Sequence, residues 1–215
     1  MAVLVYVDNA NGKIPKSALE AVYYAGKIAG TRQTDTVALV VGGVSNDNLA
    51  SLGNYGAAKV LKVTDEKLSK FDSQAYSKVI AAAIESVNAD IIVFSHNYVS
   101  KSVAPRLSAK LKAGLAVAAV DLPKNEDGVL IVKRTVYSGK AFAYFTIKAG
   151  KNIIAIQPNS LSPETTNNKA PVEDFKVELT GSDFGVTVKA INKVTDKVPL
   201  TEATVVVSGG RGRGL

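Results

Sequence analysis

Apolar and polar positions along the first 120 residues fall into blocks, and each block has the period of one kind of element. Short β-branched runs with little internal alternation predict strands that are buried on both faces. Between these runs, apolar residues recur at helical spacing. We predict strands at residues 1–7, 36–41, 59–63, 90–94 and 115–120, and helices after residue 17 and at 49–55, 74–87 and 102–111.

Two of the predicted helix starts carry capping signals. Ser17 precedes Glu20 by three positions, which is the spacing of a capping box. Asp72 stands before the third helix, where a carboxylate accepts hydrogen bonds from free backbone amides. Strands that alternate with helices in this way imply right-handed crossovers and a parallel sheet with helices on both faces.

Beyond residue 123 the alternation of strands and helices stops. Three apolar runs follow one another without a helix, which favours antiparallel pairing at one edge of the sheet. A polar loop comes next, and two later runs are expected to pair as strands. The predicted fold is an α/β, Rossmann-like three-layer sandwich with a mostly parallel sheet and an antiparallel edge from the second half. The three apolar runs are residues 129–136, 141–147 and 153–157, the polar loop is residues 160–170, and the two later runs are residues 175–179 and 186–194.

The last residues indicate the opening of a further domain. Residues 204–207 have the composition of a buried strand, and a glycine-rich loop follows at 208–215. A strand and a glycine loop with no helix behind them bury nothing. We therefore expect a first domain at residues 1–198. Residues 199–215 are then a linker with the first strand and glycine loop of a second domain that is cut short.

The glycine loop allows two interpretations. Glycines after a strand let backbone amides approach a phosphate, and Arg211 beside them would neutralise its charge. The strict dinucleotide fingerprint fails, because Gly210 and Gly212 have the first spacing but Leu215 stands where the third glycine belongs. No P-loop motif occurs in the sequence. Judged locally, the loop fits phosphate binding and an RGG-like tail that binds RNA weakly equally well.

Composition excludes several kinds of chemistry. The chain has no cysteine and a single histidine, His96. Thiolate nucleophiles, zinc–cysteine sites, iron–sulfur clusters and multi-histidine metal sites are therefore excluded, and any redox centre must be a bound cofactor. No Ser-His-Asp set or carboxylate pair can be named from the sequence, so we expect neither catalytic nor metal-binding residues.

A few polar or glycine positions at strand ends are weaker candidates for a site. Gly42 and Gly43 follow the second strand, where α/β sheets often place ligand loops, although a tight turn is the favoured interpretation. His96 follows the fourth strand, where a hydrogen-bonded surface group is favoured over a catalytic one. Lys101 and Arg106 lie near a helix start, where they could meet an anion but are expected to be solvated or paired. Asp8 and Asp121 stand at strand ends and lack any partner at acid/base spacing.

The charge and the length of the apolar runs indicate which partners to expect. The net charge of +7 comes from scattered lysines with no basic run and no nucleic-acid-binding motif, which favours an acidic protein partner over nucleic acid. The apolar runs are far shorter than the roughly 20 residues that span a bilayer, so membrane insertion is not expected. No signal-peptide pattern opens the chain, and we expect a cytoplasmic, bacterial protein.

Several segments, in order along the whole chain, resemble the N-terminal domain of the alpha subunit of electron transfer flavoproteins. The most specific is LTEATVVVSGGRG at residues 200–212, which is similar to the LxEAxIVVSGGRG sequence that opens the family's FAD-binding second domain. Thr135 and Lys140 stand where the family has a proline and an asparagine. The weaker matches are VLVY at residues 3–6, KSVAPRLSAKL at 101–111 and RTVYSGKA at 134–141.

The resemblance implies an electron carrier rather than an enzyme. In the family, alpha and beta subunits form a heterodimer with one FAD. The flavin takes electrons from flavin dehydrogenases, such as the acyl-CoA dehydrogenases of fatty acid β-oxidation, and passes them to a membrane-bound quinone oxidoreductase. The second domain of the alpha subunit holds most of the flavin, and the first packs with the beta subunit beneath it.

Matching this sequence to the family position by position gives one expected FAD contact, Arg211, supported by the loop of Ser208, Gly209, Gly210 and Gly212. The 215 residues alone are expected to hold FAD weakly or not at all, because they lack the elements that would enclose its pyrophosphate.

Two other functions stay open on the residues alone. A stand-alone adenine-nucleotide-binding module would share the strand–helix alternation, and Gly42 and Gly43 would be its ligand loop. An RNA-binding protein would use residues 208–215 and would show steeply salt-dependent affinity.

Overall fold

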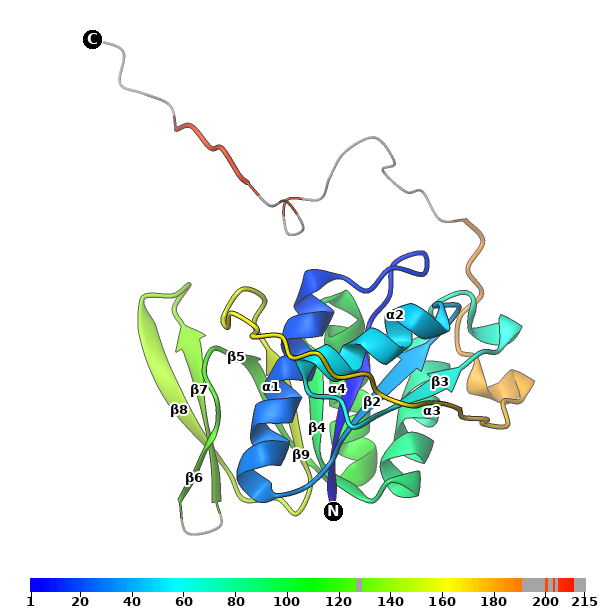
Figure 1. Cartoon of the computed structure of the whole chain (residues 1–215), viewed down its shortest axis with the longest axis horizontal. Helices are drawn as coiled ribbons and strands as arrows, with labels where there is room; N and C mark the ends of the chain where they lie inside the picture. Colours follow the sequence, from blue (N-terminus) through cyan, green and yellow to red (C-terminus); the bar gives the residue numbers. More distant parts are fainter. Residues whose placement is uncertain (127–128, 191–199, 201–202, 204, 211–215) are drawn as a thin grey trace.

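The β-branched run at the start of the chain forms the middle of a large sheet (Figure 1). This strand is buried at every position, as its uninterrupted apolar pattern predicts. The computed structural model describes residues 1–126, 129–190, 200, 203 and 205–210. In these residues the elements are β1 (Ala2–Val7), α1 (Lys16–Arg32), β2 (Thr36–Val41), α2 (Asn46–Ala50), η1 (Ser51–Tyr55), β3 (Lys59–Val63), η2 (Glu66–Leu68), α3 (Ser73–Ser86), β4 (Ala89–Ser95), α4 (Tyr98–Leu111), β5 (Gly114–Ala119), β6 (Lys124–Glu126), β7 (Val129–Val136), β8 (Ala141–Ile147), β9 (Asn152–Ile156), β10 (Val172–Asp174) and η3 (Gly181–Asp183).

The sheet confirms the predicted α/β class. The strand order is β10-β3-β2-β1-β4-β9-β5-β7-β6, and β8 pairs with β7 outside this path. The strands from β10 to β5 pair in parallel, whereas β6, β7 and β8 pair antiparallel and form the predicted edge from the second half. Because β1 lies between β2 and β4, the strand order reverses there, and the loops after β1 and β4 leave towards opposite faces.

One strand of the second half is not at the edge. The antiparallel prediction for residues 153–157 is wrong, because β9 is parallel and lies between β4 and β5. All of its residues are buried, and a strand that buries both faces belongs in the interior of a sheet. The apolar run of Ile153, Ile154 and Ile156 carried that signal.

The late strands also differ from the prediction. The short strand β10 begins at Val172, and residues 175–179 continue as irregular chain. Their apolar side chains, including Phe175 and Leu179, pack against the α3 side of the core, and the amide of Phe175 continues the pairing with β3 by donating to the carbonyl of Lys62 at 2.7 Å. Residues 186–190 form no strand, and 191–194 lie outside the described residues.

The helix starts show which capping predictions hold. Asp72 caps α3 as expected, because its carboxylate accepts from the backbone amides of Gln74 and Ala75 at 2.8 and 3.1 Å. The Ser17–Glu20 capping box is wrong. α1 begins at Lys16 after Pro15, without a side-chain cap, and the carboxylate of Glu20 accepts instead from the amide of Asn159 at 2.7 Å.

Two apolar layers cover the two faces of the sheet. Side chains of β1 alternate between them, so that Val3 and Val5 pack on the α1 side while Leu4 and Tyr6 pack on the α3 and α4 side. Figure 1 shows α1 and α2 over one face and α3 and α4 over the other, which is the predicted three-layer arrangement. Within the described part of the chain, no helix is both long and apolar enough to cross a membrane.

Candidate functional site

The predicted cofactor loop is only partly described. Ser208, Gly209 and Gly210 are exposed, and a Cβ on either glycine would meet no atom within 4 Å. Arg211 and Gly212 lie outside the described residues. The prediction of a strand at 204–207 is not supported, because residues 205–207 are exposed and form no strand, while 204 is outside the description. A strand needs a neighbour for its ladder hydrogen bonds, and no described strand pairs with these residues.

A cleft of about 780 Å³ opens at the carboxyl edge of β1, β2 and β3. The residues after β1 form one side of it, and Gly42 and Gly43 after β2 continue that side. The other lining residues come from the β3–α3 connection, from α3 and from the start of α4. The cleft is lined by Tyr6, Asp8, Asn9, Ala10, Asn11, Gly12, Val41, Gly42, Gly43, Leu68, Ser69, Phe71, Tyr76 and Val99.

The walls of the cleft are shaped by backbone turns. Gly42 adopts a φ of +109°, which favours glycine, so the predicted tight turn is present, and the residue also lines the cleft. Asn9 fixes the neighbouring loop, since its side-chain amide donates to the carbonyl of Val41 at 2.6 Å. This hydrogen bond ties the loop after β1 to the end of β2 beside the cleft. Gly12, in the loop after β1, also has a positive φ, of +80°.

Asp8 is the buried charge of the cleft, only 9% exposed. Burial raises the pKa of its carboxyl to about 6, although hydrogen bonds from Asn97 and Tyr6 act in the opposite direction. The Asn97 side-chain amide reaches Asp8 from the loop after β4 and so bridges the point where the strand order reverses. The sequence placed Asp8 at a strand end, but Asn97 is 89 positions away, and nothing in the sequence indicated that the two pair.

Other polar residues of the carboxyl edge lie apart from the cleft. His96 is half-buried, and its Nδ1 has no hydrogen-bond partner in the described part of the chain, so the structure does not show the predicted hydrogen-bonded surface group. The Nε atom of Arg134 also has no hydrogen-bond partner among the described residues. Burial lowers the pKa of His96, and the charges of Lys101 and Arg134 lower it further. Lys101 and Arg106 are exposed, as predicted, and Asp121 pairs with Lys133 at 3.5 Å.

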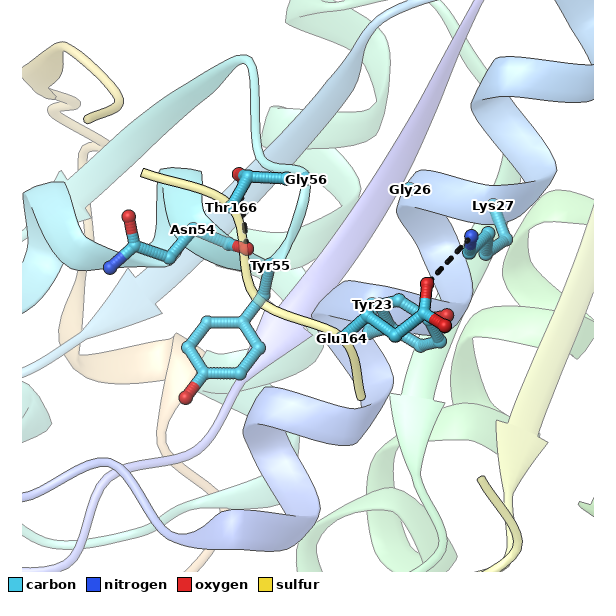
Figure 2. Close-up of a pocket in the computed structure, with 8 residues that line it drawn as sticks. All are labelled: Tyr23, Gly26, Lys27, Asn54, Tyr55, Gly56, Glu164 and Thr166. Atoms are coloured by element: carbon cyan, nitrogen blue, oxygen red, sulfur yellow. Dashed lines mark hydrogen bonds and ion pairs between the residues drawn. The ribbon is translucent and has the colours of Figure 1, made fainter. Parts of the chain in front are cut away.

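A smaller groove of about 200 Å³ lies between α1, η1 and the loop at residues 164–166 (Figure 2). Lys27 and Glu164 form an ion pair across it at 3.8 Å, and Thr166 donates its backbone amide to the carbonyl of Asn54 at 2.9 Å. Gly26 faces Gly56 so closely that a Cβ would come within 3.2 Å of the opposing backbone. This groove is a packing contact between elements.

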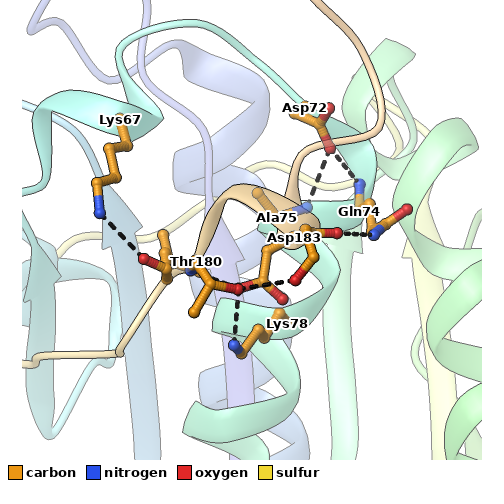
Figure 3. A network of polar contacts seen from close by, with 9 residues as sticks. Lys67, Asp72, Gln74, Ala75, Lys78, Thr180 and Asp183 are labelled. Atoms are coloured by element: carbon orange, nitrogen blue, oxygen red, sulfur yellow. Dashed lines mark hydrogen bonds and ion pairs between the residues drawn. The ribbon is translucent and has the colours of Figure 1, made fainter.

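The segment that leads out of the α/β unit is held by polar contacts, and we call residues 175–188 the exit strap. Figure 3 shows it against the start of α3. The carboxylate of Asp72 accepts from the backbone amides of Gly185 and Val186 at 3.0 and 2.9 Å. Lys78 pairs with Asp183 at 2.8 Å, and Lys67 donates to the carbonyl of Leu179 at 3.0 Å. The strap is therefore anchored along its length.

The β7–β8 hairpin exposes aromatic side chains. Phe142 is 57% exposed and Tyr144 61% exposed, on the same side of β8. Lys133 lies 4.5 Å from the ring centroid of Phe142. Among the described strands, β8 pairs only with β7, so its other edge makes no ladder hydrogen bonds. Exposed, apolar edge strands are surfaces on which another chain can pair.

Comparison with known proteins places this fold in one family. A family model described as "Electron transfer flavoprotein domain" matches residues 3–180. The electron transfer flavoprotein subunit alpha of Bacillus subtilis is 31% identical over 217 residues, which is 98% of this chain and 64% of that protein. The alpha subunit of Syntrophomonas wolfei is 32% identical over 97% of this chain and 64% of that protein.

Similarity extends to a relative with a different name. The lactate dehydrogenase (NAD(+),ferredoxin) subunit LctC of Acetobacterium woodii is 25% identical over 98% of this chain and 51% of that protein. The chain therefore spans less than two thirds of the length of the curated relatives it matches.

Proposed function

Because the chain belongs to the electron transfer flavoprotein family as an alpha-type domain, we propose that it is the supporting first domain of an electron carrier. The observation that carries this proposal is the family match over residues 3–180, which takes in almost all of the described α/β unit. The proposed work of this domain is to position other parts of the carrier rather than to catalyse a reaction.

The cofactor of the proposed carrier is FAD, which supplies reversible electron uptake and release when it is bound. We assign the start of its binding domain to residues 199–215, with Arg211 as a contact to the flavin's phosphates. The exposed backbone at Ser208, Gly209 and Gly210 fits such a role, because a Cβ on either glycine would meet no atom within 4 Å, which leaves the backbone open to a pyrophosphate. The same exposure means that these residues offer one wall and not an enclosure.

The proposed partner is a beta subunit of the same family. The exposed face and unpaired edge of the β7–β8 hairpin support this choice, because they offer apolar area and main-chain hydrogen bonds together. The electron donors and acceptor in the proposal are flavin dehydrogenases, such as acyl-CoA dehydrogenases, and a quinone oxidoreductase. The cytoplasm of a bacterium is the proposed location.

A flavin titration tests this division of labour. FAD is titrated against residues 1–215 alone and against their mixture with a beta subunit of the family. We expect no stoichiometric yellow complex with the chain alone and measurable co-purification with the beta subunit. A stable yellow complex of the chain alone would contradict the proposed supporting role.

The position of the flavin loop has its own test. The DNA beyond codon 215 is expected to continue in frame into further strands and glycine loops. In the protein so extended, purified with its beta subunit, Arg211→Ala should lower the flavin content, whereas Arg106→Ala should not. Equal flavin content in both variants would remove Arg211 from the site.

A further inference from the structure

The cleft beside Asp8 lies where open α/β sheets bind small ligands. Such ligands bind outside the carboxyl ends of parallel strands, where the strand order reverses. Here that reversal is at β1, between β2 and β4, and the cleft is formed by the residues that follow β1 and β2. Its volume of about 780 Å³ is within the range of small-molecule sites, roughly 300 to 1,000 Å³.

The described polar lining of the cleft contains one carboxylate and no cationic side chain. Among the described lining residues there is a carboxylate, Asp8, but no lysine, arginine or histidine. The lysines nearest in sequence to the cleft's Leu68 and Ser69 are directed elsewhere, because Lys67 and Lys70 donate to backbone carbonyls of the exit strap at 3.0 Å each. Among the described lining residues, a phosphate would meet the buried carboxylate of Asp8 and no cationic side chain.

The other side of the cleft suits a flat ring. Phe71 and Tyr76 pack edge to face with centroids 4.9 Å apart, and Val99 adds apolar surface beside them. Gly43, which also lines the cleft, is exposed, and a Cβ built there would meet no atom within 4 Å. A ring with hydroxyl or amino donors would find an aromatic wall, an open backbone wall and a carboxylate acceptor.

We propose that this cleft binds a neutral nucleoside, with its ribose hydroxyls donating to Asp8 and its base against the aromatic wall. A carboxylate has about four lone-pair positions. Asn97 and Tyr6 each donate a hydrogen bond to Asp8, and the remaining lone-pair positions of its carboxylate can accept from the two ribose hydroxyls. This site is independent of the flavin proposal, since it uses none of residues 199–215, and either can fail without the other.

The probe is adenosine, titrated into isotope-labelled residues 1–215 and followed by amide NMR. We expect saturable shifts centred on Gly42 and Gly43, with a dissociation constant below about 1 mM. Dideoxyadenosine, which lacks both ribose hydroxyls, should bind at least tenfold more weakly. AMP should also bind more weakly than adenosine, because its phosphate meets no cation in the cleft.

Two variants separate binding from folding. Asp8→Asn should weaken adenosine at least tenfold, whereas Asp121→Asn, the same change at an exposed carboxylate after β5, should leave it unchanged. Gly43→Leu should abolish binding and keep the wild-type thermal midpoint, because its side chain projects into open space. No saturable binding at 5 mM adenosine (about five times that limit), tighter binding of AMP than of adenosine, or equal affinity in Asp8→Asn would each overturn the proposal.

Discussion

At the scale of single residues, Asp8 shows how one buried carboxyl makes stability depend on pH. Burial raises its pKa to about 6, and the neighbouring Tyr6 and Tyr76 hydroxyls are themselves buried, so their pKa values are also raised. A folded-state pKa above the unfolded value means that the folded protein binds the proton more tightly. The stability that Asp8 contributes is therefore complete below pH 4 and is lost as the pH rises through 6.

Replacing this carboxyl with an amide tests the argument. Asp8→Asn cannot ionise, so its free energy of unfolding relative to the wild type should rise by about 2 kcal/mol between pH 4 and pH 7. Urea unfolding at several pH values measures the difference, in which the contributions of all other groups cancel. The control is Asp121→Asn, whose carboxylate is exposed. Parallel stability curves for Asp8→Asn and the wild type would show that Asp8 is not the titrating group.

Two glycines have opposite expected effects when they are replaced. A Cβ on Gly53 would lie 2.5 Å from the backbone nitrogen of Ala170 and 2.7 Å from the carbonyl oxygen of Asn168, so two backbone segments would have to separate. We expect Gly53→Ala to lower the free energy of unfolding by about 3 kcal/mol. Gly30 in α1 has no atom within 4 Å of the same position, and Gly30→Ala should raise it by roughly 0.5–1 kcal/mol.

Thermal or urea denaturation of the two variants measures both effects. Both variants carry the same Gly-to-Ala change, so a similar loss of stability in both would contradict the prediction. It would mean that neither helix propensity nor the space around the Cβ sets the change in stability, and that the close packing of residues 168–170 on η1 is not the reason for the loss at Gly53.

At the scale of elements, the sequence alone predicted the bounds of several strands correctly. The bounds of β2 and β3 match the predicted runs, because an apolar, β-branched segment is recognisable without knowing its partner. The bounds of β7 and β8 match as well, although β8 is rich in aromatic residues and largely exposed. Partner choice is a long-range property. The sequence therefore did not reveal that β9 lies between β4 and β5, nor that β10 pairs with β3.

The same limit applies to the candidate sites. Gly42, Gly43 and Asp8 were recognisable as residues at strand ends, but their common cleft depends on the strand order and on the β3–α3 connection. The flavin loop rests on a local motif, and its role stays a prediction, because Ser208, Gly209 and Gly210 are exposed and Arg211 lies outside the described residues.

Asp72 caps α3 and also binds the exit strap through the same carboxylate. Burial raises the pKa of the Asp72 carboxyl, but four backbone amides donate to it and the net shift is downward. Its contribution is therefore present above the unfolded pKa near 4 and is lost as the pH falls through the lower folded value. Asp72→Ala should cost about 2 kcal/mol, from the lost helix cap and two strap contacts together.

Limited proteolysis shows whether the strap is released. Trypsin should cleave after Lys176 at least tenfold faster in Asp72→Ala than in the wild type. Ser45→Ala removes another N-cap, that of α2, which is not among the strap contacts, and should leave that cleavage rate unchanged. If both variants are cleaved alike, the strap is not held by Asp72.

At the scale of the whole molecule, the described surface divides into a covered sheet and an uncovered hairpin. Helices close both faces of the parallel sheet, whereas β8 presents Phe142 and Tyr144 to solvent beside an unpaired edge. The net charge of +7 adds long-range attraction for an acidic partner but does not choose a face. The hairpin is the part of the described surface where apolar contact and strand pairing coincide.

A double substitution of the hairpin tests whether this face binds the proposed beta subunit. Phe142→Ser with Tyr144→Ser should weaken the association at least tenfold, because aromatic anchors dominate interface energies. The thermal midpoint should move by less than about 3 °C, since both side chains are largely exposed. The control is Tyr98→Ser, which removes a 77% exposed aromatic ring from α4. Titration with labelled beta subunit gives the three affinities. Unchanged affinity in the hairpin variant would place the interface on another face, and an equal loss in Tyr98→Ser would make the effect one of general surface apolarity.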